Sequence, residues 1–313
     1  MSLSVNVLIL NYNGAELLTK YLPSFQKAVS RSSFNCRLGV IDNRSQDHSI
    51  ELLKRDFSDV DLYLTQENRV LCSYNAIAAE VNDEVLIFMN NDILVDEYFI
   101  DPLIQPFLSQ DDVFFVTPKC LSIKDKSYEG NKARGRFRYG VLRSSALYPG
   151  HEKDIERPGP TFAGGFGAFH RKKFLELDGY DDLYLPGRLE DTDLCFRAYQ
   201  RGWRSLYEPK SIVYHLGGVS FHKTFGVRKT LVINWRNTFL FMVKNLSDAR
   251  IIFEAVLFLP FRLLYSLVSL KPELFLGFLE AVPRIPEALR RRGKLKRETF
   301  FRTVSDQSIF DQV

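Results

Sequence analysis

Apolar and polar residues alternate with two different periods in the first half of the chain. Short apolar runs predict strands at Asn6–Leu10, Leu38–Ile41, Leu62–Leu64 and Val85–Met89. Between these runs, apolar residues spaced three or four apart predict helices at Ala15–Ser30, His48–Phe57 and Ser73–Val81. The alternation of strand and helix predicts an α/β fold with a mostly parallel sheet that carries helices on both faces.

The alternation stops between Ser122 and Pro160, where the chain is polar, rich in Lys and Arg, and weak in apolar periodicity. Because long segments without regular structure are usually functional or mobile, we expect one or the other here. Regular elements then return as a glycine-rich strand, two helices and a strand, predicted at Phe162–Phe169, Arg171–Leu177, Asp191–Arg201 and Ile212–Tyr214.

After residue 226 the chain becomes aromatic and apolar, above all in Ile251–Leu270 and Glu273–Val282. The first of these segments is long enough to cross a membrane, but it contains Glu254 and Arg262, and a charge at mid-bilayer costs about 2.5–3.5 kcal/mol. We therefore expect amphipathic helices that lie on a membrane surface. The alternative is a helical subdomain or an oligomer interface that buries the same residues.

Net charge is +4 over 313 residues, and the excess is local. Eight basic and two acidic residues lie between Arg284 and Arg302, a cationic stretch that suits an anionic membrane surface and gives no reason to expect a nucleic-acid partner. The four cysteines are scattered and form no CxxC pair, which disfavours structural zinc and a disulfide framework and fits a reducing compartment. The first apolar run has no basic leader before it, so we expect a strand there and not a signal peptide.

Candidate chemistry begins where predicted strands end. The apolar run Val85–Met89 stops on Asn90-Asn91-Asp92, which places a carboxylate at the carboxyl end of a buried strand. A hard divalent cation that holds a diphosphate prefers an oxygen ligand at such a place. The alternative is an ordinary polar turn, since Asn and Asp are common turn residues.

Two earlier strand ends are also polar. The segment Leu8–Gly14 has no GxGxxG motif, which disfavours a nicotinamide-dependent Rossmann enzyme. In Val40–Ser49 the strand ends on Asp42, whose carboxylate could accept a hydrogen bond from a base or a ribose. Capping of the next helix explains Asp47 well but does not explain Asp42.

Further along, Glu190, Asp191 and Asp193 crowd the start of one predicted helix. Acidic residues at a helix N-terminus interact favourably with its dipole by about 0.3–1 kcal/mol each, so a structural role is the alternative. Mutual repulsion raises a carboxylate's pKa, which suits a general base acting on a sugar hydroxyl. His215 ends a strand, as Asp92 does, and imidazole is a common ligand of manganese-like ions.

Taken in order, these motifs resemble family 2 glycosyltransferases of the inverting kind, which have the Rossmann-like GT-A fold. The rhamnosyltransferase-like bacterial enzymes of surface polysaccharide synthesis are especially similar. The resemblance runs from about Val5 to Asn245 and rests on Asn-Tyr-Asn, Asp-Asn-x-Ser, the Asn-Asn-Asp triplet, Gly-Gly-x-Gly, Glu-Asp-x-Asp-Leu and His-x-Gly-Gly. It implies a catalytic domain at 1–226, with a nucleotide-sugar half at about 1–118 and an acceptor half at about 160–226, and a membrane-associating helical region at 227–313.

The resemblance also implies roles for individual residues. Asp191 would be the catalytic base, with Glu190 beside it at the acceptor, and Asp92 and His215 would hold Mg²⁺ or Mn²⁺. The nucleotide sugar would meet Asn11, Tyr12, Asp42, Asn68, Asn75, Asn91 and Arg236, with Arg236 offsetting charge on the leaving diphosphate. The acceptor would approach Gly164 and Gly165.

Two departures from the family pattern stand out. The first carboxylate of the metal triplet is the amide Asn90, and the bulky run Asn68-Arg69-Val70-Leu71 replaces a glycine-rich one, so that Arg69 could reach a phosphate. We expect transfer from a UDP- or dTDP-linked sugar to a glycan or lipid-linked acceptor, at the cytoplasmic, inner face of the cell membrane. The alternatives are a sugar nucleotidyltransferase and a catalytically inactive membrane-associated scaffold.

Overall fold

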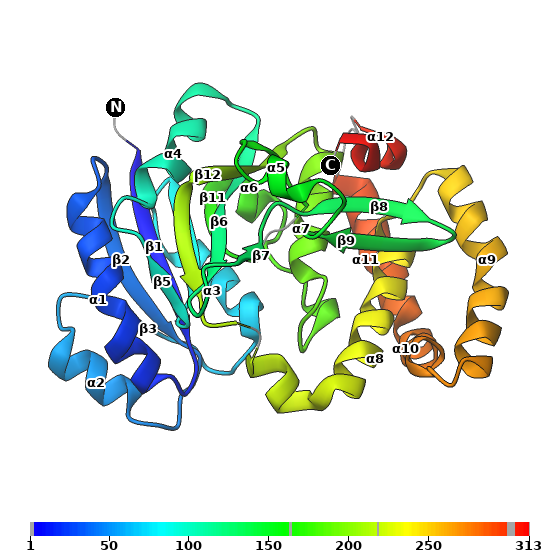
Figure 1. Cartoon of the computed structure of the whole chain (residues 1–313), viewed down its shortest axis with the longest axis horizontal. Coiled ribbons are helices and arrows are strands. Elements are labelled where there is room, and N and C mark those ends of the chain that lie inside the picture. The colour runs from blue at the N-terminus through cyan, green and yellow to red at the C-terminus, as the bar shows by residue number, and fades with distance from the viewer. Residues whose placement is uncertain (1–2, 163–164, 218, 299–303, 313) are drawn as a thin grey trace.

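The computed structural model describes residues 3–162, 165–217, 219–298 and 304–312; for 219–223 and 295–298 it describes the backbone only. A curled, mixed sheet with the strand order β10-β12-β6-β11-β4-β1-β2-β3 forms its centre, and β5 and β7 pair with β12 and β6. Helices cover both faces of this sheet, and a group of helices at the C-terminal end packs beside it (Figure 1).

The N-terminal half has the predicted alternation. Strands β1, β2, β3 and β4 are parallel neighbours and cover Ser4–Asn11, Asn35–Asp42, Asp61–Leu64 and Val85–Asn90. Helices α1, α2 and α3 connect them and cover Ala15–Arg31, Ser49–Asp56 and Ser73–Glu80, with the short 3₁₀ helix η1 at Val70–Cys72. All seven predicted elements of this half are present, each within three residues of its expected ends.

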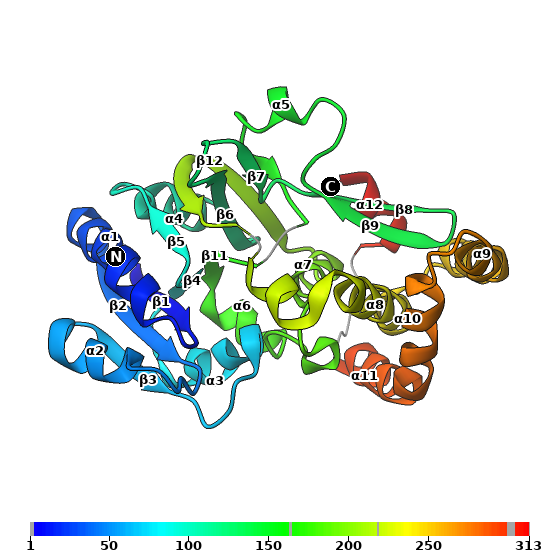
Figure 2. The same ribbon diagram turned by 60° about the horizontal axis from the view of Figure 1, so that its bottom comes forward.

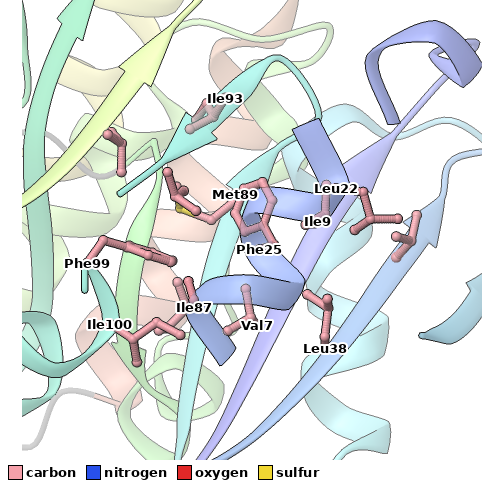
Figure 3. Packing of buried hydrophobic residues seen from close by; sticks show 14 of the residues in the cluster. Val7, Ile9, Leu22, Phe25, Leu38, Ile87, Met89, Ile93, Phe99 and Ile100 are labelled. Carbon is pink, nitrogen blue, oxygen red and sulfur yellow. The ribbon is translucent and has the colours of Figure 1, made fainter. Parts of the chain in front are cut away.

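Burial follows the alternation of side chains along each strand. Val7 and Ile9 of β1 pack on one face of the sheet with Phe25 of α1, as Figure 3 shows. Leu8 points to the other face, where it belongs to a separate cluster with Tyr74 of α3. Because both faces are covered, the central parts of the strands are mostly apolar, with the buried Asn6 of β1, which donates to Asp83, as an exception.

The second half adds strands of both directions. β6 (Val113–Ser122) and β12 (Arg204–His215) are parallel, while β11 lies antiparallel between β4 and β6. The expected strand at Phe162–Phe169 is shorter and later, since β11 covers Gly167–His170. The remaining elements here are β5, α4, α6, η2 and α7, at Ile93–Val95, Ile100–Ser109, Arg171–Glu176, Asp182–Tyr184 and Glu190–Gln200.

The segment 122–160, expected to lack regular structure, is in fact folded. It contains β7, β8, β9, α5 and β10, at Tyr128–Gly130, Arg134–Arg138, Val141–Ser145, His151–Asp154 and Gly159–Pro160. β8 and β9 form a two-stranded hairpin in which Phe137 and Leu142 face the core and arginines alternate with them. The expectation was wrong because the many arginines on the polar face of this hairpin make the alternation of inward and outward residues, typical of a strand, hard to recognise in the sequence.

The C-terminal helices share a core with the sheet domain. They are α8, α9, α10, η3, α11 and α12, at Val219–Asn245, Ala249–Val268, Glu273–Ala281, Val282–Arg284, Ile285–Glu298 and Asp306–Gln312. α8 kinks at Gly226. One apolar cluster contains Phe162 and Phe196 from before this kink together with Phe241 and Phe310 from after it. Figure 2 shows α8 lying next to α7, with α10 and α11 beyond it.

Candidate active site

The carboxyl ends of β1, β2 and β4 are joined by side-chain amides. Asn11 donates from Nδ2 to Asp42 Oδ2 at 3.0 Å, and its Oδ1 accepts from Asn91 Nδ2 at 2.7 Å. Asp42 Oδ1 accepts from the Ser45 backbone N–H at 2.8 Å. A Cβ atom on Gly14 would lie 2.1 Å from Asn91 Nδ2, so a side chain at this position would displace the Asn91 amide.

Asp42 therefore supports this turn in the present conformation. Its carboxylate is fully buried, whereas Tyr12 is 48% exposed at the same edge. Contact between Asp42 and a nucleobase would require that carboxylate to become exposed, so its proposed contact remains a prediction. Tyr12 is the side chain of this group that a ligand can reach directly.

A second amide network connects the end of β2 with the turn before α3. Asn43, buried and not singled out from the sequence, donates to Asn68 Oδ1 at 2.8 Å and accepts from Ser73 Oγ at 2.6 Å. The side chain of Asn75 lies elsewhere, because it donates to the Tyr180 carbonyl and accepts from the Tyr180 N–H. Arg69 forms an ion pair with Asp182. Asn75 and Arg69 thus anchor the loop that precedes α7.

Asp92 and His215 meet where β4 and β12 end. His215 Nε2 lies 3.3 Å from Asp92 Oδ2, and its Nδ1 lies 2.8 Å from Glu129 Oε2 on β7. Burial alone would lower the pKa of His215, but hydrogen bonds and charges from Asp92 and Glu129 raise it. Asp92 Oδ1 is buried without a hydrogen-bond partner among the described residues.

These features fit a divalent metal ion. An unsatisfied carboxylate oxygen beside an imidazole nitrogen offers two ligand atoms, which is the mixed donor set that manganese-like ions accept. Glu129 would fix the imidazole tautomer that leaves the Nε2 lone pair free towards Asp92. Cys120 lies within 4.8 Å of the Glu129 and His215 ligand atoms, but burial first, and Glu129 next, raise the pKa of its thiol and keep it protonated.

The acidic helix start divides into two functions. Asp193 is fully buried and accepts from Arg197 Nε at 2.7 Å and from Lys244 Nζ at 2.7 Å. Burial alone would raise the pKa of Asp193, but Lys244 and Arg197 hold it well below its usual range. Asp193 therefore anchors α7 to α8, and its carboxylate is fully engaged in these structural contacts.

Glu190 and Asp191 are different, because no cation pairs with either among the described ion pairs. Burial first, and the charge of Asp191 next, raise the pKa of Glu190 to about 8, and its Oε2 has no hydrogen-bond partner among the described groups. Burial also raises the pKa of Asp191, while a 2.7 Å hydrogen bond from the Thr192 N–H stabilises its charged form. Of the two neighbouring acids, Glu190 is therefore the one whose pKa of about 8 favours the protonated form near neutral pH, while the Thr192 N–H favours a charge on Asp191.

One short segment brings the metal-side residues and the acids together. A Cβ atom on Gly165 would lie 3.7 Å from Asp191 Oδ2, so this carboxylate lies beside the glycine. The next residue, Phe166, places its ring centroid 6.5 Å from that of His215. Asp191 and His215 are thus both close to residues 165–166. Gly164, the other expected acceptor residue, is outside the described part of the chain.

Residues of α8 hold the loop that carries these acids. Arg236 donates to the Leu185 carbonyl at 2.7 Å, and Asn237 Nδ2 lies 2.8 Å from the carbonyl oxygens of Tyr184, Gly187 and Arg188. Burial first, and Arg284 next, lower the pKa of Arg236 to about 10. Arg236 is 5% exposed, so it fixes the loop in this structure, and its contact with a diphosphate remains a prediction.

Sequence reasoning missed four residues that shape the site. Asn43 had a signal, since it sits inside the Asp-Asn-x-Ser motif next to Asp42. Asn237 had a similar signal, since it directly follows Arg236, whereas Glu129 and Lys244 had none because each reaches the site from an element far away in sequence. Glu129 lies in β7, within the segment 122–160 that was expected to lack regular structure.

Known proteins share this arrangement. The model of glycosyl transferase family 2 matches residues 6–177. N-acetylgalactosaminyltransferase 7 of Drosophila melanogaster is 27% identical over 212 residues, which is 56% of this chain and 35% of that protein. Polypeptide N-acetylgalactosaminyltransferase 3 of Mus musculus is 26% identical over 196 residues, 56% of this chain and 31% of that protein. The chain thus spans about a third of the length of these curated relatives.

Two solved structures share the fold. GalNAc-T7 with UDP, GalNAc and Mn²⁺ has a TM-score of 0.61 and 21% identity, covering 79% of this chain and 49% of the other. A mannosyltransferase from Pyrobaculum calidifontis in complex with GDP-Man and Mn²⁺ has a TM-score of 0.53 and 14% identity, covering 96% and 75%. Both carry the GT-A fold expected from the sequence. Since the family model covers more than half of it, the chain belongs to glycosyl transferase family 2.

Proposed function

We propose that this protein transfers a sugar from a nucleoside diphosphate donor to a hydroxyl group of a glycan or lipid-linked acceptor, with inversion at the reacting carbon. The observation that carries the proposal is the placement of Asp191 opposite Gly165, one residue from the segment that touches His215. A donor diphosphate held at Asp92 and His215 would place its sugar near residues 165–166, within reach of the base.

Different residues have different roles in the proposed reaction. Asp191 removes the proton from the acceptor hydroxyl as its oxygen attacks the sugar, and Glu190, protonated, donates a hydrogen bond without competing as a base. A divalent cation at Asp92 and His215 supplies charge that offsets the growing negative charge of the leaving diphosphate. The amide network of Asn11 and Asn91 fixes the turn that borders the diphosphate.

The donor and acceptor are proposed by class. One of the two solved structures holds UDP and GalNAc and the other holds GDP-Man, so both hold a nucleoside diphosphate, free or linked to a sugar. We propose a UDP- or dTDP-linked hexose or rhamnose, transferred during surface polysaccharide synthesis at the inner face of the cell membrane. The polar edge at Tyr12 and Asn68 is where a choice between nucleotides would be made.

The test is a panel of nucleotide sugars with Mn²⁺, read by thermal shift and by release of nucleoside diphosphate. A ligand that binds only the folded state adds about 2.7 kcal/mol at a hundredfold excess over its Kd. We expect one donor class to stabilise the protein and to be hydrolysed slowly in an Asp191-dependent way. Stabilisation without any turnover would favour the inactive scaffold, and release of pyrophosphate from a nucleoside triphosphate would favour a nucleotidyltransferase. Once an acceptor is found, the anomeric configuration of the product by NMR tests inversion.

A further inference from the structure

Helix α9 has three distinct faces. One packs on the core through Ile251 and Ser266. A second lies against the β8–β9 hairpin, where a Cβ atom on Gly140 would come within 3.0 Å of Ala255 Cα. The third, the outer face, is apolar and 48–74% exposed at Phe253, Val256, Leu257, Phe261, Leu264 and Val268. These outer residues recur three or four apart, so they form one stripe along the helix.

The two charges that argue against a membrane crossing do not lie on this stripe. Glu254 Oε1 accepts from the Gly140 N–H at 3.1 Å, and Arg262 Nε donates to the Tyr139 carbonyl at 2.6 Å. Both side chains are thus committed to the hairpin turn. By length and composition α9 could cross a membrane: its mean hydropathy is 1.9, and only 11% of its apolar stretch is buried in the protein. The contacts of Glu254 and Arg262, however, attach one side of the helix to the hairpin over about two turns.

The hairpin carries an unbalanced positive face. Arg136 and Arg143 are paired directly across its two strands, and Arg138 follows on the same side of β8. All three are exposed, and the described residues give none of them an ion pair. Like charges directly opposite each other destabilise a strand pair, so this face is understandable if an anionic partner lies against it.

The cationic stretch expected to contact lipid is largely used elsewhere. In α11, Arg291 forms ion pairs with Asp181 and Asp182, Arg290 with Glu287, and Lys294 with Asp178. Arg292 donates to the Val243 carbonyl. Arg291 and Lys294 thereby attach α11 to the segment before α7, Arg292 attaches it to α8, and Arg290 pairs within α11 itself. The arginines of the hairpin's positive face, which have no ion pair among the described residues, are the better candidates for a contact outside the protein.

We propose that the outer face of α9 and the arginine face of the β8–β9 hairpin form one surface that binds an anionic lipid bilayer. The helix lies in the interface plane with its apolar stripe among the acyl chains, and Arg136, Arg138 and Arg143 meet the headgroups. The hairpin turn joins the two parts, and both views show its tip beside α9 (Figures 1 and 2). A second copy of the chain fits less well, because a self-complementary contact would bring arginine faces together.

The experiment is co-sedimentation of the full chain with vesicles of neutral phosphatidylcholine, with and without phosphatidylglycerol. We expect binding to the anionic vesicles only. The double variant R136E/R143E should weaken that binding by on the order of tenfold or more, since each basic group near the surface contributes about 1 kcal/mol. The double variant F261E/L264E should abolish it, because it places charge in the apolar stripe.

Matched controls carry the same changes on the far side of the molecule. K54E/K172E alters two exposed lysines, and Y98E/L108E alters two residues that are 60% and 49% exposed. Equal vesicle binding by test and control variants, or no binding by the wild-type chain, would overturn the proposal. A dimer that F261E/L264E converts to a monomer, without any vesicle binding, would show an interface between copies and overturn it too. None of these readouts depends on sugar transfer, so the proposed function stands or fails separately.

Discussion

The two edges of the candidate site are held together in different ways. At the nucleotide edge, Asn11, Asp42 and Asn91 come from the ends of neighbouring strands and bond to one another. At the acidic edge, Glu190 and Asp191 are positioned by a loop and a helix that depend on α8, about fifty residues later in the chain. The first edge is made by the sheet itself, while the second requires a separate layer of support.

The difference has an energetic side. Neutral amide hydrogen bonds contribute about 0.5–1.5 kcal/mol each, so the nucleotide edge is a sum of modest terms. The acidic edge includes the buried group of Asp193, Lys244 and Arg197, in which removal of one partner leaves an uncompensated charge. Substitutions at the acidic edge should therefore have the larger effects, either on turnover or on folding.

The largest effect should come from Asp191→Asn. Loss of a general base lowers turnover by about 10²–10⁴-fold. The asparagine side chain has the same size as that of Asp191, and its amide oxygen can still accept the hydrogen bond from the Thr192 N–H. Donor binding, measured by calorimetry with Mn²⁺, should stay within a few-fold of wild type. Turnover near the wild-type rate would remove Asp191 from the mechanism.

Next in size is Lys244→Met, which tests the support and not the chemistry. Asp193 would keep Arg197 but lose a buried cation, and breaking a buried ion group costs about 3–5 kcal/mol. Urea unfolding should show this loss, whereas Lys54→Met, at an exposed site, should leave the midpoint unchanged. A Lys244→Met protein as stable as wild type would mean that Lys244 does not contribute to the support of the acidic edge.

The same contrast explains what the sequence could predict. Asp42 and Asp92 could be placed at strand ends from the sequence because strand periodicity and polar strand ends are both local, whereas Asn11 came from the family resemblance. At the acidic edge only the resemblance singled out Asp191; the local pattern could not separate it from Asp193, because the difference lies in Lys244 and Arg197 packing around Asp193. The hairpin with Glu129 nearby was missed because exposed arginines obscured its pattern. Long-range contacts decide these cases, and no local pattern encodes them.

A smaller effect is expected at Glu129, which contacts His215 between the two edges and reaches Asp92 beyond it only through that imidazole. Glu129→Gln keeps the shape but weakens the hydrogen bond that orients the imidazole, and such changes lower metal affinity about 10–100-fold. Mn²⁺ binding measured by electron paramagnetic resonance reads this directly, without turnover. Cys120→Ser is the control, and a larger loss of affinity there than in Glu129→Gln would place the ion on the Nδ1 side of His215.

A pH-dependent effect on stability is predicted for Glu190→Gln. Burial and the neighbouring Asp191 raise the pKa of Glu190 from 4.5 to about 8 in the folded protein, so the folded state holds a proton that the unfolded chain releases above pH 4.5. That contribution to stability is complete below pH 4.5 and is lost as pH rises through about 8. The glutamine cannot ionise, so the melting temperature of the variant should fall less than that of wild type between pH 5 and 9, by about 2–4 °C for each kcal/mol involved. If the melting temperatures of Glu190→Gln and of wild type fall in parallel between pH 5 and 9, Glu190 ionises normally. The acidic edge would then differ from the nucleotide edge in its partners but not in its protonation.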